Sequence, residues 1–138
     1  MDLNDIIESQ PHYIYKIFPS TLPIREPLPN RLPVSELDEQ SGFIHLSTAD
    51  QVPNTLNLFF AEEPVVYVLR IAYSVIFEYI RWESPDGKRI AEGPENGLFP
   101  HLYNGLNLGR NEVESIAIWQ NDEGWEVALK DANRWLVY

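Results

Sequence analysis

Gly42–Gln51 reads GFIHLSTADQ and combines a short strand with the beginning of a helix. Side chains alternate between the two faces of a strand, so Ile44 and Leu46 are predicted to face the core. His45 and Ser47 then project from the opposite face. The stretch therefore predicts where the chain passes from sheet to helix, and it places two polar side chains at that corner.

The second half of this stretch predicts a helix over residues 49–61. Thr48 occupies the N-cap position, and Gln51 follows at the spacing of a capping box. Pro53 lies beyond the first helical position, which predicts a kink or a short 3₁₀ start. The residues predicted to form the buried stripe of this helix are Val52, Leu56, Phe59 and Phe60. Free backbone N–H groups at such a corner can bind an anion or a small polar ligand.

Periodicity divides the rest of the chain into strands and short helices. Strands are predicted over residues 12–18, 65–71, 77–83, 98–103, 113–120 and 125–130, the last two as a hairpin. The apolar run at 65–71 predicts a central strand. Short helical segments are predicted over residues 2–10 and 35–39. Because strands dominate and helices do not alternate with them, the predicted class is α+β, with a mostly antiparallel sheet, one main helix and short accessory helices.

Two segments are predicted to lack regular structure. Prolines recur from Pro19 to Pro33, and each removes a backbone donor and biases the preceding residue toward an extended conformation. Leucines and an isoleucine interleave with them, which favours an ordered surface segment over disorder. Ser84–Gly97 carries prolines, glycines and many charges, and it predicts a long loop.

The composition excludes several classes of function. A length of 138 residues fits a single domain over residues 1–138, and no apolar run approaches the roughly 18 residues of a membrane span. The absence of cysteine excludes disulfides and thiolate nucleophiles, and it fits a reducing cytoplasm. A net charge of −11, from 21 acidic and 10 basic residues, disfavours nucleic acid and anionic membranes as partners. The expected partner is a small-molecule ligand.

Three predicted strands carry polar pairs two residues apart, and each pair projects from a single face. The pairs are His45 with Ser47, Arg81 with Glu83, and His101 with Tyr103. If the sheet brings these strands together, six polar side chains meet in one concavity. The candidate catalytic residues are His45, Glu83 and His101, and Ser47, Arg81 and Tyr103 are candidates for ligand binding.

Each of these residues also has a purely structural interpretation. His45 can be a hydrogen-bonded histidine without a catalytic role, and Thr48 can serve only as a cap. Arg81 and Glu83 can form a surface ion pair worth about 0–1 kcal/mol, and Tyr103 can be a core aromatic. The spacing of a three-histidine metal site, a glycine-rich phosphate loop or a nucleophile elbow is not present, so no metal is predicted.

Several blocks of the chain together resemble one family. They are residues 42–49, Phe59–Phe60, Arg81–Glu83 and Phe99–Tyr103. In order and spacing, the chain from about Tyr13 to Leu108 resembles the family catalogued as domain of unknown function 952. That resemblance implies a fold related to ADP-ribosyltransferases, with a small split antiparallel sheet around a cleft. Biochemical function in the family is generally unassigned.

The resemblance also implies site residues. Transferases of that fold place a His, Arg or Tyr on an early strand, a Ser-Thr element at a helix start, and a late acidic or polar residue. Tyr15 matches the first place, and Ser47 with Thr48 the second. Three candidates remain for the third place: Glu83, His101 and Tyr103. The proline-rich segment stands where a tryptophan-containing helix is usual, and the Ser84–Gly97 loop is longer than usual.

Three functions compete on these grounds. The first is a transferase or hydrolase for a nucleotide-like ligand, NAD or an ADP-ribose derivative, with NAD as the cofactor that fold analogy suggests. Glu83 could then stabilise an oxocarbenium-like charge, Arg81 could bind a diphosphate, and His45 or His101 could move protons. The second is a non-catalytic small-ligand-binding module. The third is a small-molecule tailoring enzyme with an apolar pocket.

Overall fold

A computed structural model describes residues 10–22 and 24–138, so the helix predicted before residue 10 lies outside the described residues. The strands are β1 Tyr13–Pro19, β2 Ile44–His45, β3 Val65–Ala72, β4 Ile80–Glu83, β5 Ile90–Ala91, β6 Phe99–Leu102 and β7 Val113–Gln120. The helices are α2 Glu36–Ser41, α3 Val52–Phe59, α4 Tyr73–Ile76 and α5 Trp125–Ala132. Short 3₁₀ turns follow at Phe77–Tyr79 and Asn133–Trp135. The predicted α+β class with antiparallel strands is confirmed.

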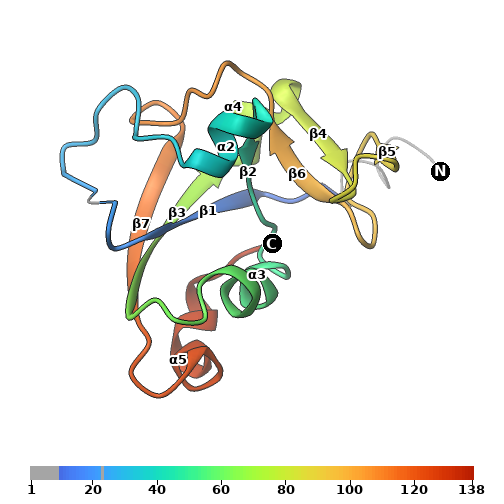
Figure 1. Cartoon of the computed structure of the whole chain (residues 1–138). Coiled ribbons are helices and arrows are strands. Elements are labelled where there is room, and N and C mark those ends of the chain that lie inside the picture. The colour runs from blue at the N-terminus through green and yellow to red at the C-terminus, as the bar shows by residue number, and fades with distance from the viewer. Residues whose placement is uncertain (1–9, 23) are drawn as a thin grey trace.

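The strands form two separate antiparallel sheets (Figure 1). One has the order β1-β3-β7, with β3 central as its apolar run predicts, and the other has the order β2-β6-β4-β5. A single bridge links β1 to the residues that follow β2. Tyr15 N donates to Ser47 O at 2.8 Å, and Ser47 N donates to Tyr15 O at 2.9 Å. The corner at Ser47 therefore holds the two sheets together.

The predicted pair of hydrogen bonds between Thr48 and Gln51 forms, but it closes a turn before the helix, and the N-cap of α3 is Gln51 and not Thr48 as predicted. Thr48 N donates to Gln51 Oε1 at 3.0 Å, and Gln51 N donates to Thr48 Oγ1 at 3.3 Å. Since α3 begins at Val52, Pro53 lies in its first turn, where no backbone donor is needed and no kink is required. The predicted burial of Phe59 is wrong, because its side chain is 70% exposed.

The C-terminal region differs from the prediction, because residues 125–130 belong to α5 and not to a strand. Trp125, Ala128 and Leu129 recur at helical spacing and pack against the apolar cluster that contains Trp119. Trp125 Nε1 donates to Phe60 O at 2.7 Å and ties α5 to the end of α3. Figure 1 shows these two helices side by side. The fold thus has two eight-residue helices in place of one main helix.

The two segments predicted to be irregular are packed against the sheets. Leu32 is buried, and Leu22, Ile24 and Leu28 pack on the same cluster, so the described part of the proline-rich segment is ordered as predicted. Gly109 allows this approach, because a Cβ there would clash with the backbone carbonyl of Asn30. The loop after β4 contains the short strand β5, which pairs with β4.

Candidate functional site

A pocket of about 680 Å³ opens between β1, α2, β2, α3 and β6. The polar part of its wall includes His45, Ser47 and His101. The apolar part is larger and includes aromatic and aliphatic side chains from α2, α3 and the β1 strand. This volume lies within the range of roughly 300–1,000 Å³ that small-molecule sites occupy.

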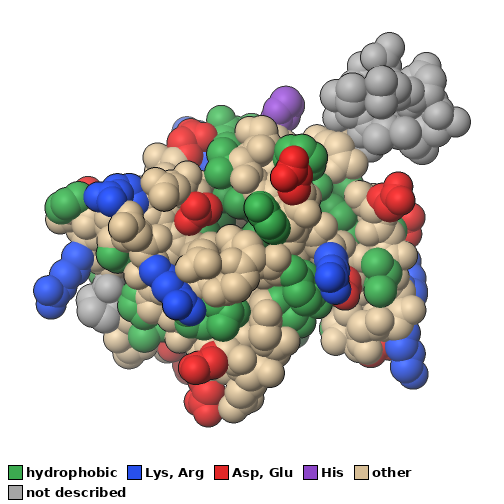
Figure 2. Space-filling model, turned by 90° about the horizontal axis from the view of Figure 1, so that it is seen from above, with side chains coloured by type: hydrophobic (Ala, Val, Ile, Leu, Met, Phe, Trp, Pro, Cys, Tyr) green, Lys and Arg blue, Asp and Glu red, His purple; other side chains and the backbone are tan. Residues whose placement is uncertain are grey.

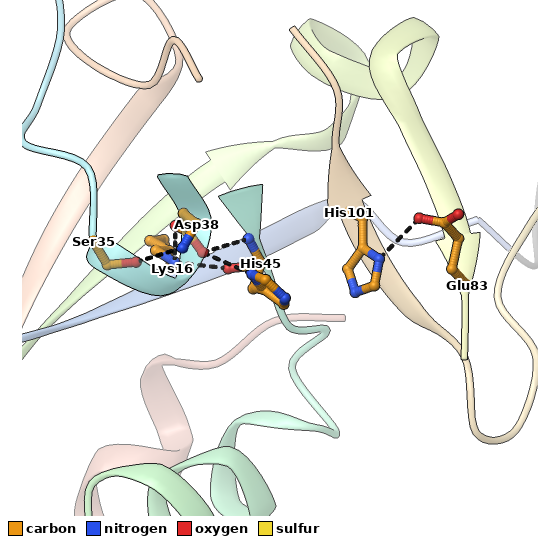
Figure 3. A network of polar contacts seen from close by, with 6 residues as sticks. All are labelled: Lys16, Ser35, Asp38, His45, Glu83 and His101. Atoms are coloured by element: carbon orange, nitrogen blue, oxygen red, sulfur yellow. Dashed lines mark hydrogen bonds and ion pairs between the residues drawn. The ribbon is translucent and has the colours of Figure 1, made fainter. Parts of the chain in front are cut away.

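His45 is held on the pocket wall by a carboxylate from α2. Its Nδ1 lies 2.7 Å from Asp38 Oδ1, and its backbone N–H donates to the same oxygen at 3.2 Å. The other oxygen, Asp38 Oδ2, accepts from Lys16 Nζ at 2.7 Å, and Lys16 also donates to His45 O at 3.0 Å. Ser35 caps α2 by accepting from the backbone N–H of Asp38 at 3.1 Å. Every oxygen of this buried carboxylate is therefore paired, and the imidazole is fixed (Figure 3).

His101 is held in the same way by a carboxylate from β4. Its Nδ1 lies 2.9 Å from Glu83 Oε1, and Tyr103 Oη donates to that oxygen at 2.6 Å. The Arg81 guanidinium lies over the Tyr103 ring, 4.2 Å from its centroid. Side-chain exposure is 7% for His101 and 10% for Glu83, so this pair is shielded from solvent.

The two histidines lie side by side on paired strands, with their rings in edge-to-face contact. His45 on β2 is the register partner of His101 on β6, and their ring centroids lie 5.1 Å apart. Phe43 stacks against both rings, with centroid distances of 4.6 Å to His45 and 4.3 Å to His101. In Figure 3 each imidazole directs Nδ1 toward its own carboxylate, which leaves Nε2 on the opposite side of the ring. The site is thus a pair of carboxylate-bound histidines in one pocket.

The local environment keeps both carboxylates ionised. Burial raises the pKa of Asp38, but hydrogen bonds from His45 and the charge of Lys16 outweigh this and hold the pKa below 3.8. Burial likewise opposes ionisation of Glu83, yet hydrogen bonds from Tyr103 and His101 bring its pKa below 4.5. Because a carboxylate only accepts hydrogen bonds, Nδ1 of each histidine carries a proton, and the neutral ring has its lone pair on Nε2.

The pKa shifts of His101 and Tyr103 favour a neutral imidazole and a protonated hydroxyl at pH 7. Burial lowers the pKa of His101 below 6.5, and Glu83 offsets only part of this effect. His101 is therefore neutral at pH 7. Burial and the Glu83 carboxylate raise the pKa of Tyr103 to about 12, so its hydroxyl keeps its proton and acts as a donor.

These directions predict that acid destabilises the protein in two stages. The unfolded chain binds a proton at its histidine near pH 6.5, whereas folded His101 binds one only at lower pH, so stability falls as the pH drops below about 6.5. Asp38 and Glu83 add a second loss below about pH 4.5, because their folded pKa values are depressed. Urea denaturation between about pH 8 and pH 3 measures both stages. His101→Gln should abolish the first stage and keep the second, and an unchanged first stage in that variant would contradict the assignment.

Of the other predicted site residues, some line the pocket and some do not. Ser47 lines the pocket, and its Oγ is 3.0 Å from Thr55 Oγ1 on α3. Tyr15 lines it too, but its hydroxyl is bonded to the backbone of Val137. Thr48 borders a different, smaller pocket and acts as a cap. Glu83, Tyr103 and the exposed Arg81 lie behind His101 and are not part of the pocket lining.

Three residues that contact the site were not predicted from the sequence. Asp38 and Lys16 anchor His45, and Phe43 packs on both histidines. One signal was present in the sequence: Asp38 follows Leu37 in a capped helical turn, where burial of the leucine is the ordinary expectation. The structure reverses this order, with Asp38 1% and Leu37 54% exposed.

On the face in Figure 2, the Lys and Arg side chains of the described residues stand apart among acidic and apolar groups. Over residues 10–22 and 24–138, no group of three or more His, Cys, Asp or Glu side chains could hold a metal ion. None of the helices described has the length and apolar character needed to cross a membrane.

Three solved structures of one protein are similar to this chain. The crystal structure of protein CC0527 from Caulobacter crescentus shares 26% identity, covers 88% of this chain and 98% of that chain, and superposes with a TM-score of 0.64. A crystal structure of a double mutant of CC0527 gives the same values. Its solution NMR structure, also at 26% identity, covers 81% of this chain and 88% of that chain, with a TM-score of 0.56.

No protein of curated function matches the chain. A family profile described as Protein of unknown function (DUF952) matches residues 28–116. The matched residues include α2, β2, α3, β4 and β6, and therefore both carboxylate–histidine pairs. Because this match spans more than half of the chain, the protein belongs to the DUF952 family.

Proposed function

We propose that this protein is an enzyme in which His45 and His101 act as a general acid–base pair on a small molecule, in hydrolysis or group transfer. The observation that carries the proposal is the cross-strand pair of imidazoles, each bound through Nδ1 to a buried carboxylate, in edge-to-face contact with ring centroids 5.1 Å apart. A carboxylate on Nδ1 fixes the tautomer, orients the ring and stabilises the imidazolium that forms during proton transfer.

The environments of the two rings assign different roles. His101 is shielded and neutral at pH 7, so its Nε2 is the base that takes the proton from water or from an acceptor hydroxyl. The oxygen then attacks the electrophilic centre of the substrate. His45, whose side chain is 33% exposed, takes up a second proton from solvent at Nε2 and donates it to the departing group as the bond breaks. His101 then releases its extra proton to solvent, and His45 takes up a new proton from solvent. The whole cycle adds one molecule of water or acceptor across the bond.

A transferase or hydrolase for NAD or an ADP-ribose derivative is the second candidate. It is supported by the two antiparallel sheets and the Ser47–Thr48 corner, which fit the ADP-ribosyltransferase-like arrangement that the family resemblance implies. Two placements weigh against it. Arg81, the expected diphosphate ligand, is exposed and stacks on Tyr103. Glu83 contacts His101 and is not part of the pocket lining, which removes it from direct contact with a ribosyl cation.

NMR of the histidine ring nitrogens, combined with a substrate panel, tests the acid–base proposal. At about pH 8 both rings are expected as the Nδ1–H tautomer, and His45→Gln and His101→Gln identify each signal. The panel contains chromogenic esters, chromogenic phosphodiesters and NAD. Turnover is expected to fall about 10²–10⁴-fold in either variant, whereas Ser41→Ala, at the same pocket, should stay within about twofold.

Two results would contradict the proposal. One is a His101 ring that carries its proton on Nε2, since that nitrogen could not act as a base. The other is turnover that survives both substitutions. If the two variants change the affinity for a panel compound, and wild type shows no turnover of it, the protein is the non-catalytic binding module instead.

A further inference from the structure

We infer that the molecule bound in this pocket is uncharged and largely apolar, with one polar reactive group. The inference rests on the proposed function and specifies its substrate class. The reactive group lies at the two histidines, and the apolar body extends to the mouth of the pocket between α2 and α3.

The first argument is the charge of the pocket wall. Among the described lining residues, the groups that are always charged at neutral pH are Lys16 and Asp38. They neutralise each other at 2.7 Å, and their side chains are only 9% and 2% exposed. A phosphate or carboxylate placed in the pocket would therefore lose its hydration without gaining an unpaired cation. The net charge of −11 adds a long-range repulsion of anions.

The second argument is the apolar mouth, formed by Leu37 on α2 with Leu58 and Phe59 on α3. Their exposures are 54%, 65% and 70%, although all three line the pocket. In α2 the polar Asp38 is buried whereas Leu37 is not. In α3, Val52 and Leu56 are buried, and Leu58 and Phe59 are left exposed. Clustered exposed apolar side chains at a concave site are typical of a ligand-binding surface.

The third argument is the arrangement of polar groups along the pocket. The hydroxyls of Ser47 and Thr55 are bonded to each other, so these two polar groups of the lining are already paired within the protein. Phe18, Phe43, Phe60 and Phe99 add aromatic surface to the lining. A ligand with one polar group for the histidines and an otherwise apolar body matches a lining that is mostly apolar.

Two matched fluorescent probes test the inference on the whole chain. N-phenylnaphthylamine is neutral, and anilinonaphthalenesulfonate has the same ring framework with an added sulfonate. The neutral probe is expected to bind with enhanced fluorescence, and the sulfonated probe about tenfold or more weakly. NAD and ADP-ribose at millimolar concentration should not displace the neutral probe. Equal affinity for the two probes, displacement by NAD or ADP-ribose, or no binding of the neutral probe would overturn the inference.

Substitutions at the mouth locate the binding site. Leu58→Ser and Phe59→Ser are expected to weaken binding of the neutral probe about threefold to tenfold each. Ile118→Ser on β7 is the matched control, because Ile118 is 62% exposed and lies outside the pocket lining. All three sites are exposed, so the variants should fold. An equal effect of the control would contradict binding at this mouth.

A further variant separates this inference from the proposed function. His101→Gln should lower turnover about 10²–10⁴-fold yet keep affinity for the neutral probe within about threefold, because the apolar lining remains. Probe binding without any histidine-dependent turnover would contradict only the proposed function. Histidine-dependent turnover of NAD or another anionic compound would contradict only the substrate class.

Discussion

Asp38→Ala is expected to lower the free energy of unfolding by about 3–5 kcal/mol, the range for removing one partner of a buried ion pair. The substitution leaves the Lys16 ammonium, 9% exposed, without its counter-ion. It also removes the acceptor for both the ring and the backbone N–H of His45. Burial already lowers the pKa of Lys16, and only Asp38 opposes that effect, so the variant lysine is expected to lose its proton more easily. Urea denaturation at pH 7 measures the loss.

The double variant Lys16→Met with Asp38→Leu is the control for this prediction. Replacing both charges by apolar groups of similar size removes the desolvation cost together with the attraction, so it should recover most of the stability. It should not recover activity, because His45 would still lack the carboxylate that orients its ring. A loss below about 1 kcal/mol in Asp38→Ala would contradict the view that the buried ion pair holds α2 to β1.

The sequence predicted the strands of this fold better than its helices, for physical reasons. β1, β3 and β7 have one or two buried faces, and their periodicity is visible in the residue order. Residues 125–130 contain tryptophan, valine and leucine, which are compatible with either structure over so short a range. The helix is more stable than a strand here because Trp125 and Leu129 then share one face and can pack beside α3. That tertiary contact cannot be predicted from the local sequence alone.

The polar pairs on the strands were visible in the sequence, whereas their partners were not. The i, i+2 pattern predicted that each polar pair projects from one face of its own strand, and the β2–β6 register places His45 beside His101. Their two carboxylates have different origins. Glu83 belonged to a predicted pair, but Asp38 reaches His45 from a helix that had been given no functional role. Burial of Asp38 beside exposed Leu37 departs from ordinary amphipathic patterning, and such departures are expected at functional sites.

Glu83→Gln is expected to reduce kcat about 10²–10⁴-fold and to leave KM nearly unchanged, by analogy with loss of the orienting carboxylate in a catalytic triad. Glu83 acts as a positioning residue, since it contacts His101 Nδ1 and does not line the pocket. A glutamine can present its NH₂ group to Nδ1, which would favour the wrong tautomer and protonate the catalytic Nε2. NMR of the His101 ring nitrogens should show that change directly.

The pH profile distinguishes this role of Glu83 from general damage to the fold. Glu83 raises the pKa of His101 against the larger effect of burial, so its removal should move the acidic limb of the rate profile to lower pH. Tyr103→Phe is the matched control, because it removes a hydrogen bond to the same oxygen while the 2.9 Å contact with His101 remains. That variant should lose less than about tenfold in kcat and should keep the Nδ1–H tautomer. If Tyr103→Phe and Glu83→Gln lowered kcat equally, the loss would come from altered packing around β4 and β6. The assignment of Glu83 as a positioning residue would then be wrong.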